Sequence, residues 1–368
     1  MYDAIIVGAR CGGSPLAMQL ARKGHNVLVV DRAHFPSDTL STHALTGEAS
    51  KHLQAWGLLD RVVAADGRPV HDHSRHFSEG QEFRIPGFNI APRRTVLDSI
   101  LVEAAREAGA EVREGCAVVG LVRDADGQVT GITIQSDGHV STEEARIVVG
   151  ADGRNSFVAR EVGAEVYNEQ PPLSMGYYSY FEDYPLEAIE VHWGDGFVCF
   201  AFPTSNGQVC LAVERHREHF HTFRADTDGE FRKAHEAAGL GERYARARRV
   251  EEWRGATDLP NHYRKPFGPG WALVGDAGYV KDPVLGMGVN DAFRDAELLS
   301  SALDSVFRGE ADFDAALGGY QQQRDAASGQ MYAINYEFSK LAVTPMHLEM
   351  LRAGAAAQFE AAAATAAE

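Results

Sequence analysis

The sequence is poor in cysteine, and its few cysteines show neither C-x-x-C pairs nor the spacing of metal ligands. The four are Cys11, Cys116, Cys199 and Cys210. Scattered cysteines of this kind are typical of reduced thiols inside the cell. We therefore expect a cytoplasmic protein without a bound metal.

Basic residues and long apolar runs are also scarce. Lysine and arginine number 35 against 52 aspartates and glutamates, for a formal net charge of −17. Nucleic-acid binding needs a basic face toward the phosphates, so we expect no nucleic-acid partner. No apolar run reaches the roughly 18 residues that span a bilayer, so we expect no integral membrane segment. Because the first predicted strand begins at residue 2, we expect no signal peptide.

What the sequence does contain begins with residues 1–32. Residues 2–8 predict a buried strand, the glycines from Gly8 to Gly13 a turn, and residues 14–23 a helix. A second strand over 26–30 ends at Asp31. Strand, glycine turn, helix, strand and acid in this order form the context of a dinucleotide-binding fingerprint.

Each part of this fingerprint has a physical role. Gly8 permits a tight turn, Gly13 permits close packing of helix on strand, and the helix N-terminus offers N–H groups to a pyrophosphate. Asp31 follows at the distance where an acid accepts hydrogen bonds from ribose hydroxyls. The middle glycine is replaced by Arg10. Either the motif is degenerate, or this arginine supplies positive charge to the diphosphate.

The rest of the chain predicts alternating strands and helices, with an aromatic-rich sheet between residues 173 and 215. The charged segment 215–238 predicts a helix, the basic stretch 243–249 a solvated face, and the alanine-rich tail 351–368 a helix or a frayed end. The other predicted elements are a loop over 34–43, a helix over 47–56, a hairpin within 69–90, a helix over 91–108, a strand over 111–113, a meander with turns at 126–127 and 137–138, strands over 146–150 and from 270, and helices ending near 303 and 341.

Three separated motifs together resemble the FAD-dependent monooxygenases of the aromatic-hydroxylase type (class A). This family shares a superfamily with geranylgeranyl reductases and flavin-dependent halogenases. The first motif is the fingerprint from Gly8 to Asp31, and the second is Asp152-Gly153-Arg-Asn-Ser156. The third is Gly275-Asp276 followed by Pro283, Gly286 and Gly288. The motifs stand in the family order and cover nearly the whole chain.

The resemblance implies an α/β fold. It predicts a Rossmann-like FAD-binding domain with a parallel central sheet and an antiparallel meander, a second domain with an antiparallel sheet, and C-terminal helices. We assign 1–69, 91–165 and 255–308 to the FAD-binding domain, 70–90 and 166–254 to the substrate-binding domain, and 309–368 to the helical region.

The resemblance also implies roles for individual residues. The glycine turn would hold the pyrophosphate, Asp31 the adenosine ribose, Asp276 a ribityl hydroxyl, and the segment 283–290 would pass the flavin ring. For each acid the alternative is a turn or helix-capping residue. The predicted cofactor-binding residues are Gly8, Arg10, Gly12, Gly13, Asp31, Arg32, Thr42, Arg94, Asp152, Gly275, Asp276, Pro283, Gly286, Gly288 and Asn290.

Two smaller sets concern the reaction itself. The predicted flavin-proximal residues are His43, Pro283 and Met287, and no catalytic residue is assigned. The candidates for substrate binding are the aromatic side chains Tyr178, Tyr180, Phe200 and Phe202, for which ordinary core packing stays open.

Two departures from the family pattern bear on the reaction. The hydroxylases place an arginine in the loop after the second strand, whereas this chain has Ser41-Thr42-His43. With Phe35-Pro36 the loop is closer to the reductase and halogenase branch. The W-x-W-x-I-P motif of the halogenases is absent, so we do not expect halogenation. Only one nucleotide fingerprint is present, so NAD(P)H would dock transiently.

The leading hypothesis is an FAD-dependent, NAD(P)H-dependent monooxygenase. It would hydroxylate or epoxidise a small apolar or aromatic substrate with O₂ through a flavin C4a-hydroperoxide. The second hypothesis is a flavin-dependent reductase or dehydrogenase that acts on a C=C or C–H bond. The third is a flavin-binding protein without turnover. The expected partners are the small-molecule substrate and O₂, in a monomer or homodimer.

Overall fold

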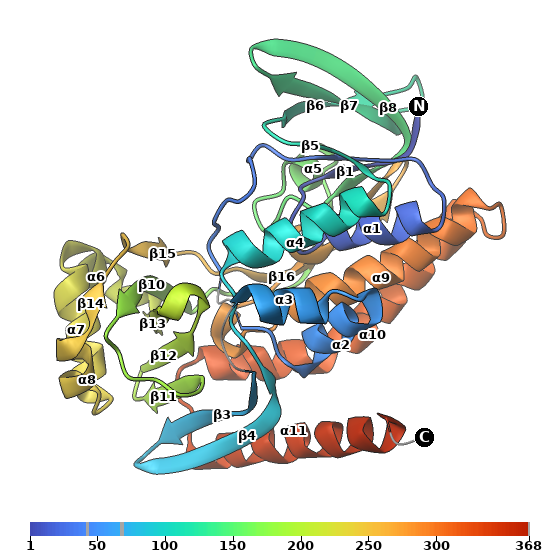
Figure 1. The fold of residues 1–368 in the computed structure, drawn as a ribbon. Helices are drawn as coiled ribbons and strands as arrows, with labels where there is room; N and C mark the ends of the chain where they lie inside the picture. Colours follow the sequence, from blue (N-terminus) through green and yellow to red (C-terminus); the bar gives the residue numbers. More distant parts are fainter. Residues whose placement is uncertain (42–43, 67–69, 367–368) are drawn as a thin grey trace.

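The computed structural model describes residues 1–41, 44–66 and 70–366, and Figure 1 shows how its elements are arranged. The first of two large sheets carries the parallel strands of the N-terminal fingerprint. Its strand order is β17 (Phe267–Gly268), β18 (Trp271–Leu273), β8 (His139–Gly150), β1 (Tyr2–Val7), β2 (Val27–Val30) and β5 (Glu111–Arg113). The strands from β18 to β5 run parallel, and β6 (Ala117–Arg123), β7 (Val129–Ser136) and β8 form an antiparallel meander. The predicted Rossmann-like sheet and its meander are therefore confirmed.

Both faces of this sheet are covered, which explains why β1 and β2 are nearly continuous apolar runs. One face packs against α1 (Gly13–Arg22), α4 (Arg94–Glu107) and α9 (Gly288–Phe307). The other face packs against the meander and α5 (Phe157–Glu161). Because these strands are parallel, their carboxyl ends lie at one edge of the sheet. The loops after β1, β2, β8 and β18 lie at this edge.

The second sheet holds the aromatic strands and the predicted hairpin. Its order is β14 (Arg248–Arg249), β10 (Ser174–Glu182), β13 (Val209–His216), β12 (Phe197–Pro203), β11 (Glu190–Gly194), β3 (His71–Ser78) and β4 (Gln81–Asn89), with β15 (Arg254–Ala256) beside β10. The hairpin β3–β4 joins this sheet by a parallel pairing of β3 with β11. The sheet is therefore antiparallel except for this one pair, which pattern reading along the chain did not predict.

Short helices cover one face of the second sheet. In Figure 1, α6 (Phe220–Ala225), α7 (Thr227–Ala237) and α8 (Gly241–Arg246) flank it on the left. The segment 215–238, expected to be helical, is helical from residue 217 to residue 237 except at Asp226. Asp226 leaves helical geometry at φ −145°, and its Oδ1 accepts a hydrogen bond from Gly229 N at 2.9 Å, so it caps a new helix.

The remaining elements fill the space around the sheets. α2 (Gly47–Trp56) and α10 (Phe313–Ser339) match their predicted ranges closely, and α11 (Pro345–Ala366) shows that the described tail is helical and runs along β4 (Figure 1). Two further features were not predicted: α3 (Leu59–Asp66), and the small sheet of β9 (Val166–Gln170), β16 (Asn261–Arg264) and β19 (Tyr279–Val280), whose strands are short. The described residues also form the 3₁₀ turns η1 (Ser205–Gly207), η2 (Arg217–His219), η3 (Gly275–Ala277) and η4 (Pro283–Leu285).

In the described parts of the chain, no helix combines the length and the apolar character needed to cross a bilayer. All four cysteines are free and buried. The same described residues include no group of three or more His, Cys, Asp or Glu side chains placed to hold a metal ion.

Candidate cofactor and active site

One large cavity, of about 1080 Å³, lies where the carboxyl ends of the parallel strands face the second sheet. This is the edge at which open α/β sheets bind their ligands. The volume lies at the upper end of the range for small-molecule sites, so it has room for more than one ligand. The predicted cofactor-binding residues that line it are Gly8, Arg10, Gly12, Asp31, Arg32, Arg94, Asp152, Gly275, Asp276, Pro283 and Gly288.

The turn after β1 accepts only glycine at two positions. A Cβ on Gly8, where φ is +106°, would lie 2.4 Å from the Ala151 carbonyl oxygen. A Cβ on Gly13 would lie 1.8 Å from the Gly8 carbonyl oxygen. Gly13 does not line the cavity, so its role in this turn is to let α1 pack closely against β1.

The N-terminus of α1 is open to a ligand. Its N-cap residue is Gly12, and no side chain caps the helix. Ser14 N donates to the Arg10 carbonyl oxygen at 3.0 Å, and Pro15 has no N–H group. The helix therefore offers the cavity the N–H of its N-cap residue Gly12 and the positive end of its dipole. This arrangement fits the pyrophosphate of a dinucleotide.

Asp31 holds the glycine turn in place. Its side chain is buried at the end of β2, where Oδ2 accepts a hydrogen bond from Ala9 N and Oδ1 one from Ala33 N, both at 2.8 Å. The carboxylate thus links the turn after β1 to the turn after β2. A ribose would use the remaining lone pairs of the same two oxygens.

Arg10 is bound to the protein as well as facing the cavity. Its Nη1 lies 2.5 Å from Asp98 Oδ2, and its Nη2 donates to Ser37 Oγ at 2.8 Å. Arg94 donates to the other oxygen of Asp98 at 2.8 Å. Two arginines therefore share one fully buried carboxylate, which leaves a net positive charge at the cavity wall. This charge complements a diphosphate.

Asp152 caps a helix. Its Oδ2 accepts from Phe157 N at 2.6 Å, and its Oδ1 accepts from Ser156 Oγ at 2.5 Å, at the start of α5. Burial, the largest effect, raises the pKa of this carboxyl although these hydrogen bonds oppose it. Both oxygens are engaged locally, as in the capping alternative, and cofactor binding by Asp152 stays a prediction.

Asp276 differs from the other two acids because its carboxylate is exposed to the cavity. No hydrogen bond joins it to another residue of the described ranges. Loss of hydration around the carboxyl group is the largest effect and raises its pKa to about 6. The negative charge of Asp291 also raises this pKa, and the positive charges of Lys281 and Arg94 lower it. An acceptor that faces the cavity without a partner fits a ligand hydroxyl.

The segment from Pro283 to Asn290 turns into the N-terminus of α9. Pro283 and Gly288 line the cavity, whereas Gly286, Met287 and Asn290 do not. Asn290 Nδ2 donates to Thr46 Oγ1 at 2.7 Å, and Asn290 Oδ1 is buried without a partner in the part of the chain that the structure describes. No side chain caps α9 at Met287, so its first-turn N–H groups are free to stabilise negative charge.

The aromatic candidates divide into two groups. Tyr178, Phe200 and Phe202 line the cavity, and Tyr178 also donates to the Thr39 carbonyl oxygen at 3.3 Å. Tyr180 does not line it: the ring is fully buried, with the Arg93 guanidinium 3.5 Å from its centre. The predicted residues Thr42 and His43 lie outside the described residues.

Several ionisable residues of the cavity wall were not predicted from the sequence, among them Glu214, Lys281 and Asp282. Glu214 and Asp282 are almost completely buried, and Ser174 Oγ lies within hydrogen-bond distance of both. The Lys281 ammonium bonds Asp291 Oδ2. The available signal was an acid inside the apolar strand β13, since charged residues are rarely buried without a reason.

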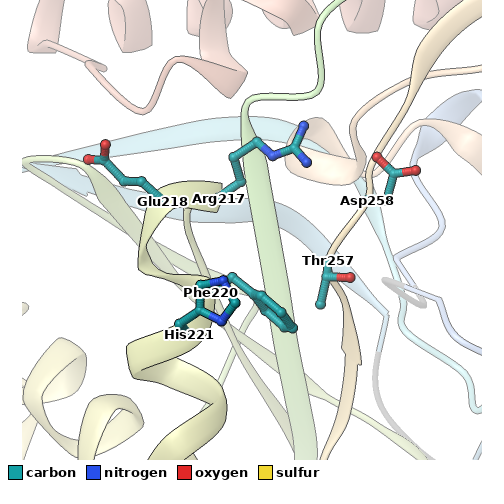
Figure 2. Close-up of a pocket in the computed structure, with 6 residues that line it drawn as sticks. All are labelled: Arg217, Glu218, Phe220, His221, Thr257 and Asp258. Atoms are coloured by element: carbon teal, nitrogen blue, oxygen red, sulfur yellow. The ribbon is translucent and has the colours of Figure 1, made fainter.

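A smaller cavity of about 450 Å³ lies elsewhere, between the start of α6 and the segment 257–258 (Figure 2). Figure 2 shows Phe220 and Thr257 across from each other, with Arg217 and Asp258 at its opposite sides. It shares no lining residue with the large cavity and includes none of the predicted site residues.

Comparison with known proteins identifies one family and several relatives. The family model described as "FAD binding domain" matches residues 1–334. The chain is 24% identical over 355 residues to a digeranylgeranylglycerophospholipid reductase of Methanocella arvoryzae, which covers 92% of this chain and 87% of the relative. It is 26% identical to an aklavinone 12-hydroxylase of Streptomyces peucetius, over 89% of this chain and 72% of the relative.

Solved structures give the same fold. A myxobacterial chondrochloren halogenase superposes with a TM-score of 0.83 at 24% identity, over 90% of this chain and 81% of the halogenase. At this identity the likeness concerns the fold alone.

Proposed function

The chain belongs to the FAD binding domain family and is a flavoprotein oxidoreductase, and from that premise we propose that it is a monooxygenase. It would use NAD(P)H and O₂ to hydroxylate or epoxidise a small apolar or aromatic substrate. The observation that supports this most is the large cavity, which reaches continuously from the N-terminus of α1 to the aromatic side chains of the second sheet. One space can therefore hold a dinucleotide and a substrate side by side.

We infer that features at the cofactor end of this cavity would hold most parts of FAD. The α1 N-terminus and the Arg10–Asp98–Arg94 cluster would hold the diphosphate. Asp31 would bind the adenosine ribose, and Asp276 a ribityl hydroxyl. The N-terminus of α9 would stabilise negative charge on the ring. When bound, FAD supplies the redox chemistry with NAD(P)H and O₂.

The other end would shape the substrate site. Tyr178, Phe200 and Phe202 bring apolar surface from β10 and β12 to the cavity wall. Such a wall orients a flat apolar molecule and excludes water from the reaction.

A second candidate function is a flavin-dependent reductase that acts on a C=C bond. The Phe35-Pro36 loop and the similarity to the Methanocella arvoryzae reductase favour it. Halogenation is not proposed, because the tryptophan motif is absent and the one lysine at the cavity wall is paired with Asp291.

Flavin reduction and reoxidation test the two candidates. Purified holoprotein is mixed with NADH or NADPH and a panel of small aromatic compounds, with and without O₂. We expect substrate-stimulated NAD(P)H oxidation that stops when O₂ is removed. Turnover that continues anaerobically would establish the reductase instead. A flavin that neither nucleotide bleaches, with any substrate, would indicate a protein without turnover.

A further inference from the structure

Two acidic side chains meet inside the wall of the large cavity, beside Pro283. Glu214 comes from β13 and Asp282 from the residue before η4, and their exposed fractions are 4% and 1%. The Ser174 hydroxyl of β10 donates to Glu214 Oε1 at 2.7 Å and also contacts Asp282 Oδ2 within hydrogen-bond distance. Both acids line the cavity.

The number of available hydrogens indicates that one of the two carboxyl groups is protonated. The Ser174 hydroxyl has a single hydrogen, so it can donate to only one of its two carboxyl neighbours. The other contact needs a hydrogen on one of the two carboxyl groups. Asn335, which donates Nδ2 to the Asp282 carbonyl oxygen at 2.9 Å, adds a buried Oδ1 that has no partner within the described ranges. Acceptors therefore outnumber donors at this point.

No positive charge compensates the pair. Among the described residues, no ion pair includes Glu214 or Asp282, and the nearby cations are engaged elsewhere. Lys281 bonds a carboxylate of α9, Arg215 bonds one of α7, and burial lowers the pKa of His262 to about 4, which keeps it neutral. Two buried carboxylates without a cation cannot both stay ionised at low cost. Burial first, and then the Asp282 charge and its hydrogen bond, raise the pKa of Glu214 well above its ordinary value.

We propose that Glu214 and Asp282 share one proton and that this pair accepts a proton from an acidic hydroxyl group of the substrate, such as that of a phenol. The direction follows from charge. A second proton makes the pair neutral, whereas loss of the shared proton would leave two buried negative charges. In the step, the substrate O–H bond breaks, its proton moves to the free carboxylate oxygen, and the electron pair stays on the substrate oxygen. The pair later returns the proton to solvent.

The substrate class rests on the proposed function. An ionised oxygen on an aromatic ring makes the ring electron-rich, which favours attack by an electrophilic oxygen. The aromatic side of the cavity supplies the apolar surface for such a ring. The structure thus narrows the proposed substrate to hydroxylated aromatic compounds.

The shared proton is tested without turnover, by infrared spectroscopy of the holoprotein at pH 8. We expect a protonated-carboxyl C=O band in the wild type, its loss in Glu214→Gln, and no change in Glu144→Gln, which alters an exposed acid. Ser174→Ala, which keeps both carboxyls, should shift the band and provides the test if Glu214→Gln fails to fold. A wild type without the band, or variants that leave it unchanged, would overturn the shared proton.

Proton acceptance is tested with pairs of phenols and their methyl ethers in NAD(P)H-dependent turnover. We expect the wild type to use phenols in preference to ethers. Glu214→Gln should lower phenol turnover on the order of 10²-fold with unchanged FAD content. Equal use of ethers, or full activity of the variant, would overturn the proposed base. Absence of any turnover would count against the proposed function, and the infrared band would still decide whether the pair shares a proton.

Discussion

At the scale of single residues, the three motif acids have different roles although each follows a strand of the first sheet. Asp31 accepts from two backbone N–H groups, and Asp152 accepts from Phe157 N at the start of α5. Asp276 faces the cavity and has no hydrogen-bond partner among the described residues. The motifs predicted that all three would gather near one ligand. They did not predict which carboxylate would form hydrogen bonds with the protein's own backbone, because those bonds depend on N–H groups that the turns position.

Asp276 gives a prediction for cofactor affinity. Asp276→Asn should weaken FAD binding by about 1.5–3 kcal/mol, or roughly 10- to 100-fold in Kd, because a charged acceptor is lost. Asp258→Asn, an exposed acid of the smaller cavity, is the matched control. Equilibrium dialysis or flavin fluorescence measures the Kd, and equal affinity of both variants and wild type would refute the assignment.

The same residue predicts a pH dependence. Its pKa is raised to about 6, so the carboxylate is ionised above that value and protonated below it. The affinity of the wild type for FAD should therefore fall as the pH drops through 6. In Asp276→Asn this fall should be absent, and a titration of Kd between pH 5 and pH 8 compares the two proteins.

The raised pKa of Glu214 predicts that its contribution to the stability of the protein falls as the pH rises. A carboxyl whose pKa is raised on folding stabilises the native state at low pH, and this contribution is lost as the pH rises through the folded value. The Tm of Glu214→Gln minus that of wild type should therefore become more positive from pH 5 to pH 9. Thermal unfolding at several pH values measures it, and a constant difference would contradict a raised pKa.

At the scale of elements, the predictable parts were those with a strong local signal. β1, α1 and β2 carry buried apolar runs, helical spacing and glycine punctuation in one continuous stretch. The helical segment expected over 215–238 is divided because one aspartate, Asp226, offers its side chain to the backbone and starts a new helix. The pairing of β3 with β11 links strands more than a hundred residues apart, and local pattern contains no information on such a partner.

The turn between β1 and α1 gives a prediction at this scale. Gly13→Ala should destabilise the protein and abolish FAD retention, because its Cβ would lie 1.8 Å from a backbone oxygen. Gly318→Ala is the control: it lies in α10 with nothing within 4 Å of the new Cβ. That change should stabilise by about 0.5–1 kcal/mol. Thermal unfolding and flavin content after purification distinguish the two.

At the scale of the whole molecule, the two large sheets have separate cores but a common cavity. The cofactor motifs come from both ends of the chain, because parallel strands distant in sequence end at the same edge. The fold could be predicted from those motifs and their resemblance to a family. The cavity wall opposite the cofactor motifs could not be predicted from the sequence. Glu214 and Asp282 become neighbours only when β13 packs beside the loop before η4.

The proposed monooxygenase reaction is tested most directly by the origin of the oxygen in the product. Holoprotein is supplied with NAD(P)H, a hydroxylated aromatic substrate that stimulates NAD(P)H oxidation, and ¹⁸O₂, and the product is analysed by mass spectrometry. We predict one ¹⁸O atom per product molecule and none from labelled water. A product that gains two hydrogens and no oxygen, formed equally well without O₂, would contradict the proposal.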